Sequence, residues 1–557
     1  MKLFKREDLF IRTTQENIEP QTKRKWLPIA GAGAFILVVI IFLFFVDGSL
    51  LPKTDDTKYK NEQTVVLPMV AVSSLNPLIS KDEDTYFISS LIYEGLFALD
   101  EHLSPTPMLA EKYTIDQKNK TITLTLRQGV VFQDGTPLKA EDVKYSIDAF
   151  KAAGIASLYQ NEIDKIDKAK ISSQDTIVIT FKTNTDMSLD LLTFPILPKN
   201  QFDNIAGAIA KVSNFKPIGT GAYQYKSYDK TAQLILTANS QYYGQIPKNE
   251  LAFQVLPNGL NYFNLLKASN LSLLISKDAS RQSELSGEDV SVVDFTSNEV
   301  EYLGFNFSQL DLAKRSVRLA IATAINPQEI IDESYYGSGV VNSDLYYPGY
   351  MDSKKMKDPY VYEPTASEKY LNKAGYLDNN GDGFVETADG LPLTFRILVN
   401  DNNASRVLAA NQLKDSLAKV GMIANVEIVD WNTYLAKLQT GDFDLYLGGM
   451  KLSQNMDLRS LLATGGQTNY LSYGNGKLDE LLNNMCSGLT PTEMQKTYIE
   501  IRTILHDDMP YFCLLYKTYG AIKSPALIGE ISPTFWNYYQ GSESWYCRYE
   551  VMAQTNP

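Results

Sequence analysis

The chain has 557 residues, of which 44% are apolar and 11% aromatic, enough to bury large cores in about two to four domains. Its formal net charge of −13 argues against nucleic acid as a partner, because binding phosphates requires a positive surface. Three cysteines, Cys486, Cys513 and Cys547, make no disulfide framework, so buried free thiols are expected, with one bridge in an oxidising compartment as the alternative.

The first predicted element is a membrane-spanning helix over residues 26–46. This stretch carries no charge, and at about 1.5 Å of rise per residue it is long enough to cross a hydrocarbon layer of roughly 30 Å. Lys23, Arg24 and Lys25 precede it, so residues 1–25 are expected in the cytoplasm and the large remainder outside the cell. A cleaved signal peptide is the alternative, disfavoured by the long apolar run and the absence of an A-x-A site.

Residues 47–61 are polar and predict a short linker. Alternating apolar residues over 122–126 then predict a strand, and helical spacing over 143–150 predicts a helix. The segment GTGAY at 219–223 resembles a phosphate-binding loop. Because it has neither the strand-loop-helix context nor the lysine of such loops, it is interpreted as a turn leading into a strand.

The segment DNNGDGFVETAD, residues 378–389, matches the ligand spacing of a calcium loop. Positions 1, 3, 5, 6, 9 and 12 of that loop are Asp378, Asn380, Asp382, Gly383, Glu386 and Asp389. Position 12 is aspartate instead of the longer bidentate glutamate, and two flanking helices are not evident. The loop is therefore interpreted as a solvated turn, no metal site is predicted, and calcium is expected to have little effect on stability.

A strand-helix-strand unit follows. Residues 393–399 have period two and predict a half-buried strand, and apolar residues at helical spacing over 407–420 predict a helix that ends at Gly421. Val426 and Ile428 then predict a second strand. Such a crossover is typical of an α/β domain with a parallel sheet.

An enzyme is the main alternative class, and it requires a nucleophile–base pair or a cluster of metal ligands. The two histidines, His102 and His506, lie in no hydrolase or metal motif such as H-E-x-x-H or G-x-S-x-G. They are interpreted as ordinary surface or capping residues. No catalytic residue and no cofactor is predicted.

Ten stretches follow one another in a characteristic order along the chain. They are LNPLIS (75–80), YEGLF (93–97), PMLAEKY (107–113), LRQGVVFQDGTPLKAEDVKYS (126–146), PIGTGAY (217–223), YLGFNFS (302–308), VRLAIATAINPQEI (317–330), YLNKAGY (370–376), DWNTYLAKLQTGDFDL (430–445) and LSYGNGKLDELL (471–482). In this order they resemble the extracellular solute-binding proteins of family 5, which include the oligopeptide- and dipeptide-binding proteins of ABC importers. The resemblance covers about residues 63–540.

The resemblance implies an α/β, type II periplasmic-binding-protein-like fold of two lobes with an inserted subdomain, preceded by the one transmembrane helix. Lobe I would comprise residues 62–100, 216–297 and 519–557, the inserted subdomain residues 101–215, and lobe II residues 298–518. Two chain crossings would form a hinge, and the ligand would close one lobe on the other.

The function implied is that of a monomeric, membrane-tethered extracellular protein of an ABC importer, without enzyme activity, which captures peptides or a related small solute and works with permease subunits. Two alternatives stand beside it. A tethered ligand sensor or receptor would use the same fold without transport, and an extracellular hydrolase would require the catalytic groups that the sequence does not display.

By motif position, the ligand site would draw on residues of lobe II. They are Tyr302, Asn400, Trp431, Gly449, Lys451, Ser453 and Asn469. In peptide-binding relatives the extended ligand pairs with backbone, and Gly449 would let such a ligand strand approach closely. For Tyr302 and Trp431, core packing is the alternative.

The stretch GMKLSQNMD, residues 449–457, departs from the family pattern G-W-x-x-D-Y-x-D-P, in which the first aspartate holds the α-ammonium of the peptide. Met450 replaces the tryptophan, Ser453 replaces that aspartate, and Lys451 is added. Binding is therefore expected not to depend on a positively charged N-terminus, and Lys451 favours an anionic or neutral polar ligand. Three acidic residues are the alternative anchors: Asp442, Asp444 and Asp457.

Overall fold

The computed structural model describes residues 59–202, 204–212, 214–257, 262–267, 270–281, 285, 290–351 and 360–550. The chain divides into two compact units, Met1–Lys60 with Glu550–Pro557, and Asn61–Tyr549; the fold below is that of the second. The predicted membrane helix over 26–46 and the tail 1–25 lie outside the described residues. Among the residues that are described, no helix is both long and apolar enough to cross a membrane.

The largest sheet has seven strands, in the order β12-β18-β13-β17-β15-β16, with β14 paired to β18. Their bounds are β12 (Leu273–Ser276), β13 (Ser291–Phe305), β14 (Gly339–Val340), β15 (Thr394–Asn400), β16 (Ile423–Val429), β17 (Leu445–Lys451) and β18 (Tyr511–Lys523).

The predicted strand-helix-strand unit is confirmed by β15, α12 (Ala404–Ala418) and β16, since β15 and β16 pair in parallel. The helix ends at Ala418, and Gly421 follows with φ of +82°, a conformation that glycine adopts without strain. The prediction of a half-buried strand is wrong for β15, because Leu398 and Asn400 on its second face are also buried.

Helices cover both faces of this sheet, which explains the double burial. Phe395, Ile397 and Val399 pack into a core with α9 (Arg315–Ala324), α10 (Pro327–Ser334), α11 (Pro364–Lys373) and α12. Leu398 packs on the other face with α13 (Trp431–Thr440), α14 (Arg459–Leu462), α15 (Gly476–Met485) and α16 (Pro491–Asp508). A central strand buried on both sides is usual where helices flank a sheet.

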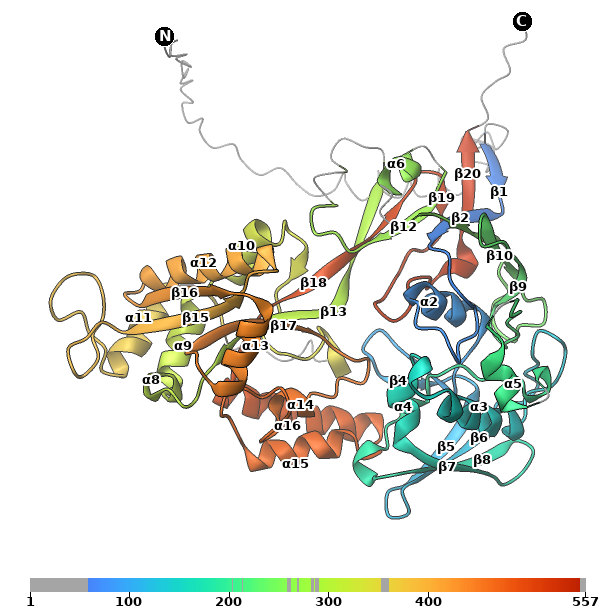
Figure 1. Cartoon of the computed structure of the whole chain (residues 1–557), viewed down its shortest axis with the longest axis horizontal. Coiled ribbons are helices and arrows are strands. Elements are labelled where there is room, and N and C mark those ends of the chain that lie inside the picture. Colours follow the sequence, from blue (N-terminus) through green and yellow to red (C-terminus); the bar gives the residue numbers. More distant parts are fainter. Residues whose placement is uncertain are drawn as a thin grey trace, which may run out of the picture. The chain divides into compact units, whose positions relative to one another are not determined.

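Two long strands, β13 and β18, pair antiparallel in the middle of the sheet, with β12 beside β18 and β17 beside β13 (Figure 1). Their pairing is continuous from Ser291 to Thr296, shifts register, and resumes at Val300 opposite Tyr516. Such a bulge bends a strand locally. The shift lies at the predicted boundary of lobes I and II, near residues 297 and 518.

Two four-stranded sheets lie in the N-terminal half of the chain. One has the order β2-β11-β10-β9 and another β5-β6-β8-β7. Their strands are β2 (Thr64–Met69), β9 (Tyr223–Tyr228), β10 (Gln233–Ala238), β11 (Glu250–Val255), β5 (Ala110–Asp116), β6 (Thr121–Leu126), β7 (Ile166–Ile171) and β8 (Thr176–Phe181).

The other regular elements are short. They are β1 (Tyr59–Glu62), β3 (Phe97–Leu99), β4 (Pro105–Pro107), α4 (Gln160–Lys165), α5 (Ile205–Ala210), α6 (Tyr262–Lys267), α8 (Leu310–Ala313), β19 (Leu527–Ile528) and β20 (Tyr546–Glu550).

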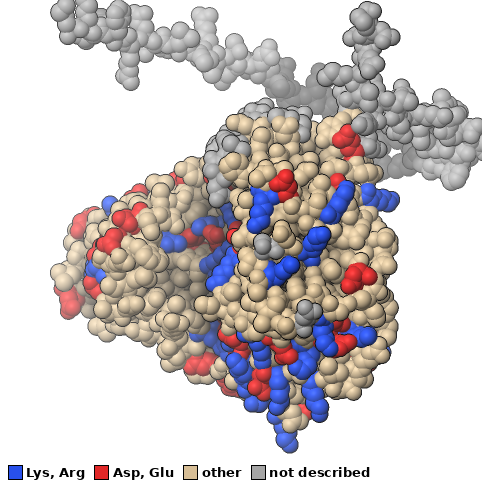
Figure 2. Space-filling view, turned by 45° about the vertical axis from the view of Figure 1, so that its right-hand side comes forward, with Lys and Arg blue, Asp and Glu red and all other residues tan. Residues whose placement is uncertain are grey.

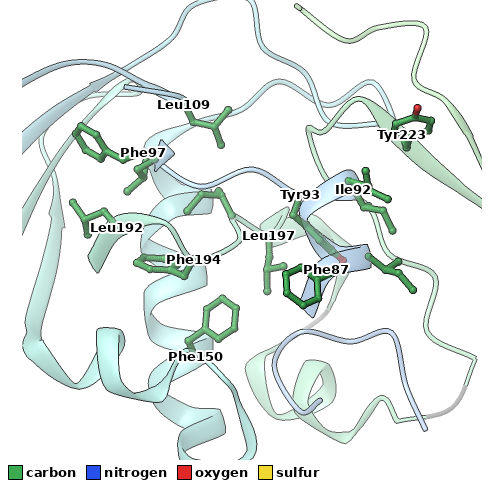
Figure 3. Close-up of a cluster of buried hydrophobic side chains, with 14 of the residues drawn as sticks. Phe87, Ile92, Tyr93, Phe97, Leu109, Phe150, Leu192, Phe194, Leu197 and Tyr223 are labelled. Carbon is green, nitrogen blue, oxygen red and sulfur yellow. The ribbon is translucent and has the colours of Figure 1, made fainter. Parts of the chain in front are cut away.

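The predicted strand over 122–126 is confirmed as β6, and the predicted helix over 143–150 as α3 (Ala140–Ala153). Phe150 of α3 packs in one buried cluster with Phe87 and Ile92 of α2 (Glu83–Ile92), as Figure 3 shows. The predicted inserted subdomain and the first part of predicted lobe I therefore share a single hydrophobic core.

The segment GTGAY is a turn that leads into β9, as predicted. A Cβ atom added to Gly219 would lie 2.0 Å from the carbonyl oxygen of Ile92, so only glycine allows the two backbones to approach. Cys513 and Cys547 are buried and Cys486 is half-buried, and none of the three forms a disulfide.

Candidate ligand-binding site

A cleft of about 400 Å³ lies between the end of β17 and the helices α2 and α4. Lys451 and Ser453 line it from one side, and Tyr86 and Tyr159 line it from the other. A second cavity, of about 230 Å³, shares Tyr86, Tyr159, Thr193 and Gln454 with the first. The two cavities thus adjoin along one wall, which gives room for an elongated ligand.

The backbone after β17 is held by Asn298, at the register shift of β13. The backbone N–H of Leu452 donates to the carbonyl oxygen of Asn298 at 2.8 Å, and the Asn298 side-chain amide donates back to the carbonyl oxygen of Leu452. Leu452 is buried by this arrangement, while Lys451 and Ser453 on either side of it are exposed. Alternation along an extended chain therefore turns these two polar side chains the opposite way from Leu452.

A direct contact crosses the cleft. The side-chain amide of Gln454 donates to the hydroxyl of Tyr86, which belongs to α2. Burial raises the pKa of Tyr86 to about 12, so its hydroxyl is neutral at physiological pH. The Tyr86 ring lies 5.9 Å from that of Tyr159 between ring centroids, and both rings wall the cleft.

Charged residues line the cleft and lie beside it. Glu83 accepts from Lys277 at 2.5 Å. Lys451 lies opposite Glu299 in the pairing of β13 with β17. Burial opposes ionisation of Glu299, but a hydrogen bond from Tyr519 and the nearby charge of Lys517 outweigh it and lower the Glu299 pKa.

Glu162 of α4 differs from the other acidic residues of the cleft. Its Oε2 atom is buried and has no hydrogen-bond partner within the described part of the chain. Burial raises the pKa of its carboxyl, so the negative charge is the costly state there. The side chain lines the cleft together with Lys451.

Of the predicted site residues, Lys451 and Ser453 line the cleft. Tyr302, Asn400 and Gly449 lie instead around a buried ion pair, Arg406–Glu301, whose Nε and Oε2 atoms are 2.8 Å apart.

The contacts of these three residues are internal. Asn400 accepts from the Arg406 guanidinium at 2.8 Å. A Cβ atom on Gly449 would lie 2.5 Å from Nη2 of Arg406, so the close approach made possible by this glycine is to the guanidinium. Tyr302 is 5% exposed and packs against Tyr511, with ring centroids 5.0 Å apart, which agrees with the core-packing alternative.

Trp431 and Asn469 do not line the cleft. Trp431, at the first turn of α13, is 45% exposed and stacks on Tyr434, so core packing does not describe it. The side-chain amide of Asn469 donates to the carbonyl oxygens of Ala463 and Tyr473 and thereby holds its own loop. A ligand role for either residue stays a prediction.

The three alternative acidic anchors are already engaged by cations. Asp442 accepts from Arg396 at 2.9 Å and from Lys437 at 2.6 Å. Asp444 lies 3.6 Å from Arg396, and Asp457 pairs with Arg459 at 2.6 Å. None of them lines the main cleft.

Sequence reasoning missed the aromatic wall formed by Tyr86, Tyr159, Tyr519 and Tyr538. The 34 tyrosines of the chain are a signal in composition only, because these four come from segments far apart in sequence. Neither histidine lines the cleft. His102 pairs with Glu101 at 3.3 Å, and burial lowers the pKa of His506 to about 4.

The layered α/β architecture, the two long connecting strands and the cleft beside them define a solute-binding protein. A model of the bacterial extracellular solute-binding proteins, family 5, middle region, matches residues 104–470. The chain belongs to this family.

Curated relatives and solved structures agree with this assignment. The chain is 25% identical over 503 residues to the oligopeptide-binding protein AppA of Bacillus subtilis (strain 168), which covers 86% of this chain and 92% of AppA. It is 25% identical over 501 residues to the glutathione-binding protein GsiB of Salmonella typhimurium (strain LT2), and this match covers 83% of this chain and 91% of GsiB. The unliganded open form of the periplasmic murein tripeptide-binding protein MppA superposes with a TM-score of 0.73 at 18% identity. The superposition covers 88% of this chain and 98% of MppA.

Proposed function

We propose that the protein is a membrane-tethered extracellular component of an ABC importer, which captures a peptide or a related small solute in the cleft beside β17. The observation that carries the proposal is the cleft of about 400 Å³ with polar side chains on one wall and tyrosines on the other. Relatives named as oligopeptide-binding and glutathione-binding support the class of ligand. The importer's permease subunits are the partners.

Ligand capture is proposed to close the cleft by bending at the register shift of β13. Residues 298–518 would move as lobe II, and residues 62–297 with 519–557 would carry the opposing wall. The proposal rests on two observations: the pairing of β13 with β18 is interrupted between Thr296 and Val300, and Gln454 already reaches Tyr86 across the cleft. A bend confined to a few residues is the usual way in which binding proteins close.

The ligand proposed is neutral or anionic at the end that faces Ser453. Asp442, Asp444 and Asp457 do not replace the aspartate of the family pattern there, since each is paired with a cation. Lys451 supplies a positive charge, moderated by Glu299 opposite it. A tethered sensor without transport would use the same cleft, and a permease and ATPase gene beside this one would favour import.

Ligand binding at this cleft is expected to stabilise the outer domain and to leave the ligand chemically unchanged. A small-molecule screen of peptides, oligosaccharides and metal chelates by thermal shift tests this. At a hundredfold excess over Kd, a ligand stabilises the native state by about 2.7 kcal/mol. Ser453→Trp, which places an indole in the cleft, should abolish the shift. Chemical conversion of any ligand into a product would instead favour the alternative that the protein is an enzyme.

The matched control for that substitution is Ser173→Trp, in the exposed turn between β7 and β8. It should leave the ligand-induced shift intact. Figure 2 shows that charged side chains of both signs crowd the lower part of the molecule. Equal loss of ligand response in both variants would contradict the placement of the site.

Protease added to intact cells or protoplasts is expected to remove the large domain and leave a small membrane fragment. The reason is the uncharged stretch at 26–46 with its basic flank, which orients the N-terminus towards the cytoplasm. Immunoblots against tags at the two termini give the measurement. A mature N-terminus near residue 50 would show that the segment is cleaved and not an anchor.

A further inference from the structure

Three carboxylates converge in the loop that connects α11 to β15. One carboxylate oxygen from each of Asp378, Asp382 and Glu386 lies within 4.8 Å of the others. Like charges at this spacing repel one another, and a cation among them would offset that repulsion. The ligand cleft beside β17 includes none of these residues.

Glu386 provides a second and independent observation. The residue is 4% exposed, whereas Asp378 and Asp382 are exposed. Its Oε2 atom accepts from the backbone and side-chain N–H groups of Asn379, at 2.7 and 3.1 Å. Its Oε1 atom is buried without a hydrogen-bond partner in the described chain. A buried carboxylate oxygen without a donor is costly, and a metal ion would satisfy it.

The backbone holds the three carboxylates in this arrangement. Glu386 forms isolated bridges with Leu377 and Pro392, so its position in the loop is determined on both sides. The Asp378 carboxylate accepts from the backbone N–H groups of Gly381 at 2.7 Å and Gly383 at 3.0 Å. Both glycines have φ near the left-handed region, +78° and +91°, which lets the chain turn tightly around the group.

The donor set determines the kind of ion. The converging side-chain atoms are carboxylate oxygens. Calcium prefers oxygen ligands around a flexible turn of this spacing, whereas zinc prefers the nitrogen and sulfur of histidine and cysteine. We propose that residues 378–386 bind Ca²⁺ through the carboxylates of Asp378, Asp382 and Glu386.

This proposal revises the interpretation of the loop as a solvated turn. That interpretation rested on the lack of two evident flanking helices and on the short aspartate at position 12, Asp389, which is exposed and is not a member of the group. The buried acid is Glu386, at position 9. Val385, beside it, donates to the carbonyl oxygen of Gly421 at 2.8 Å, so an ion here would fasten the loop to the turn between α12 and β16.

The test uses the full chain, purified in detergent and stripped of divalent ions with a chelator. Calcium chloride titrated by calorimetry should bind at one site per chain, and calcium should raise the Tm by several degrees. Asp382→Asn and Glu386→Gln should each abolish both effects, and Asp389→Asn, the matched control, should preserve both.

Asp382 is exposed, so Asp382→Asn tests the site even if Glu386→Gln does not fold. Absence of heat and of a Tm change in the wild-type protein would overturn the proposal. So would retention of calcium binding in Asp382→Asn, or equal stabilisation by magnesium chloride, which would indicate a general cation site instead of a calcium site.

Discussion

Replacing Glu301 with glutamine is expected to lower the free energy of unfolding by about 3–5 kcal/mol, because removing one member of a buried ion pair leaves the other charge without a partner. Glu301 is 2% exposed. Its carboxylate accepts from Nε and Nη2 of Arg406 at 2.8 and 3.0 Å, and lies 3.2 Å from Nζ of Lys517. The substitution thus removes the negative charge that both Arg406 and Lys517 contact.

Arg406 cannot escape the loss by releasing its proton. Burial opposes the charged form of the guanidinium, but the attraction and hydrogen bonds of Glu301 outweigh burial and raise its pKa. Without Glu301 the guanidinium would stay charged in a site that also holds Asn400 and the backbone at Gly449. The destabilisation should therefore extend to the end of β17, which carries Lys451 into the cleft.

Urea unfolding of the outer domain, analysed by linear extrapolation, measures the effect. The matched control is Asp148→Asn, which breaks the Lys144–Asp148 pair on the surface of α3, at 2.5 Å and with both side chains 41% exposed. Exposed pairs contribute about 0–1 kcal/mol, so the control should unfold nearly as the wild type does. A Glu301→Gln loss no larger than that of the control would show that the buried pair does not stabilise the fold.

Wild-type protein is expected to bind the free and N-acetylated forms of one peptide equally, or to bind neither, while Ser453→Asp should favour the free amine by a hundredfold or more. Burying an ammonium without a carboxylate typically costs about 3–5 kcal/mol, and Ser453 offers only a hydroxyl. The new aspartate would stand where the family pattern has its amine-binding residue. Isothermal titration of both peptide forms against both proteins gives the comparison.

Ser453→Asn is the control of nearly equal size that adds no charge, and it should behave as the wild type does. A wild-type protein that loses a hundredfold in affinity on acetylation would show that another group holds the ammonium. Glu162 is the first residue to change in that event, because it lines the cleft with an unpartnered Oε2 atom. Glu162→Gln would then remove the preference.

The strand-helix-strand unit of β15, α12 and β16 could be predicted because a period of two or 3.6 is a property of consecutive residues. The turn at Gly219 and the ordered family motifs are equally local. Short stretches of chain were also enough to predict the family and the α/β class. They were enough to predict that Lys451 and Ser453 lie beside the cleft.

What the sequence by itself determined is therefore the class of fold and the presence of a neutral serine at position 453. Only the tertiary structure decided which neighbours surround each predicted residue. Gly449 faces Arg406, and Ser453 shares a cleft with Glu162, because strands and helices distant in sequence pack together there. Glu386 likewise became a buried acid through bridges on both sides of its loop. Burial and pairing are long-range properties that depend on packing, and no local periodicity encodes them.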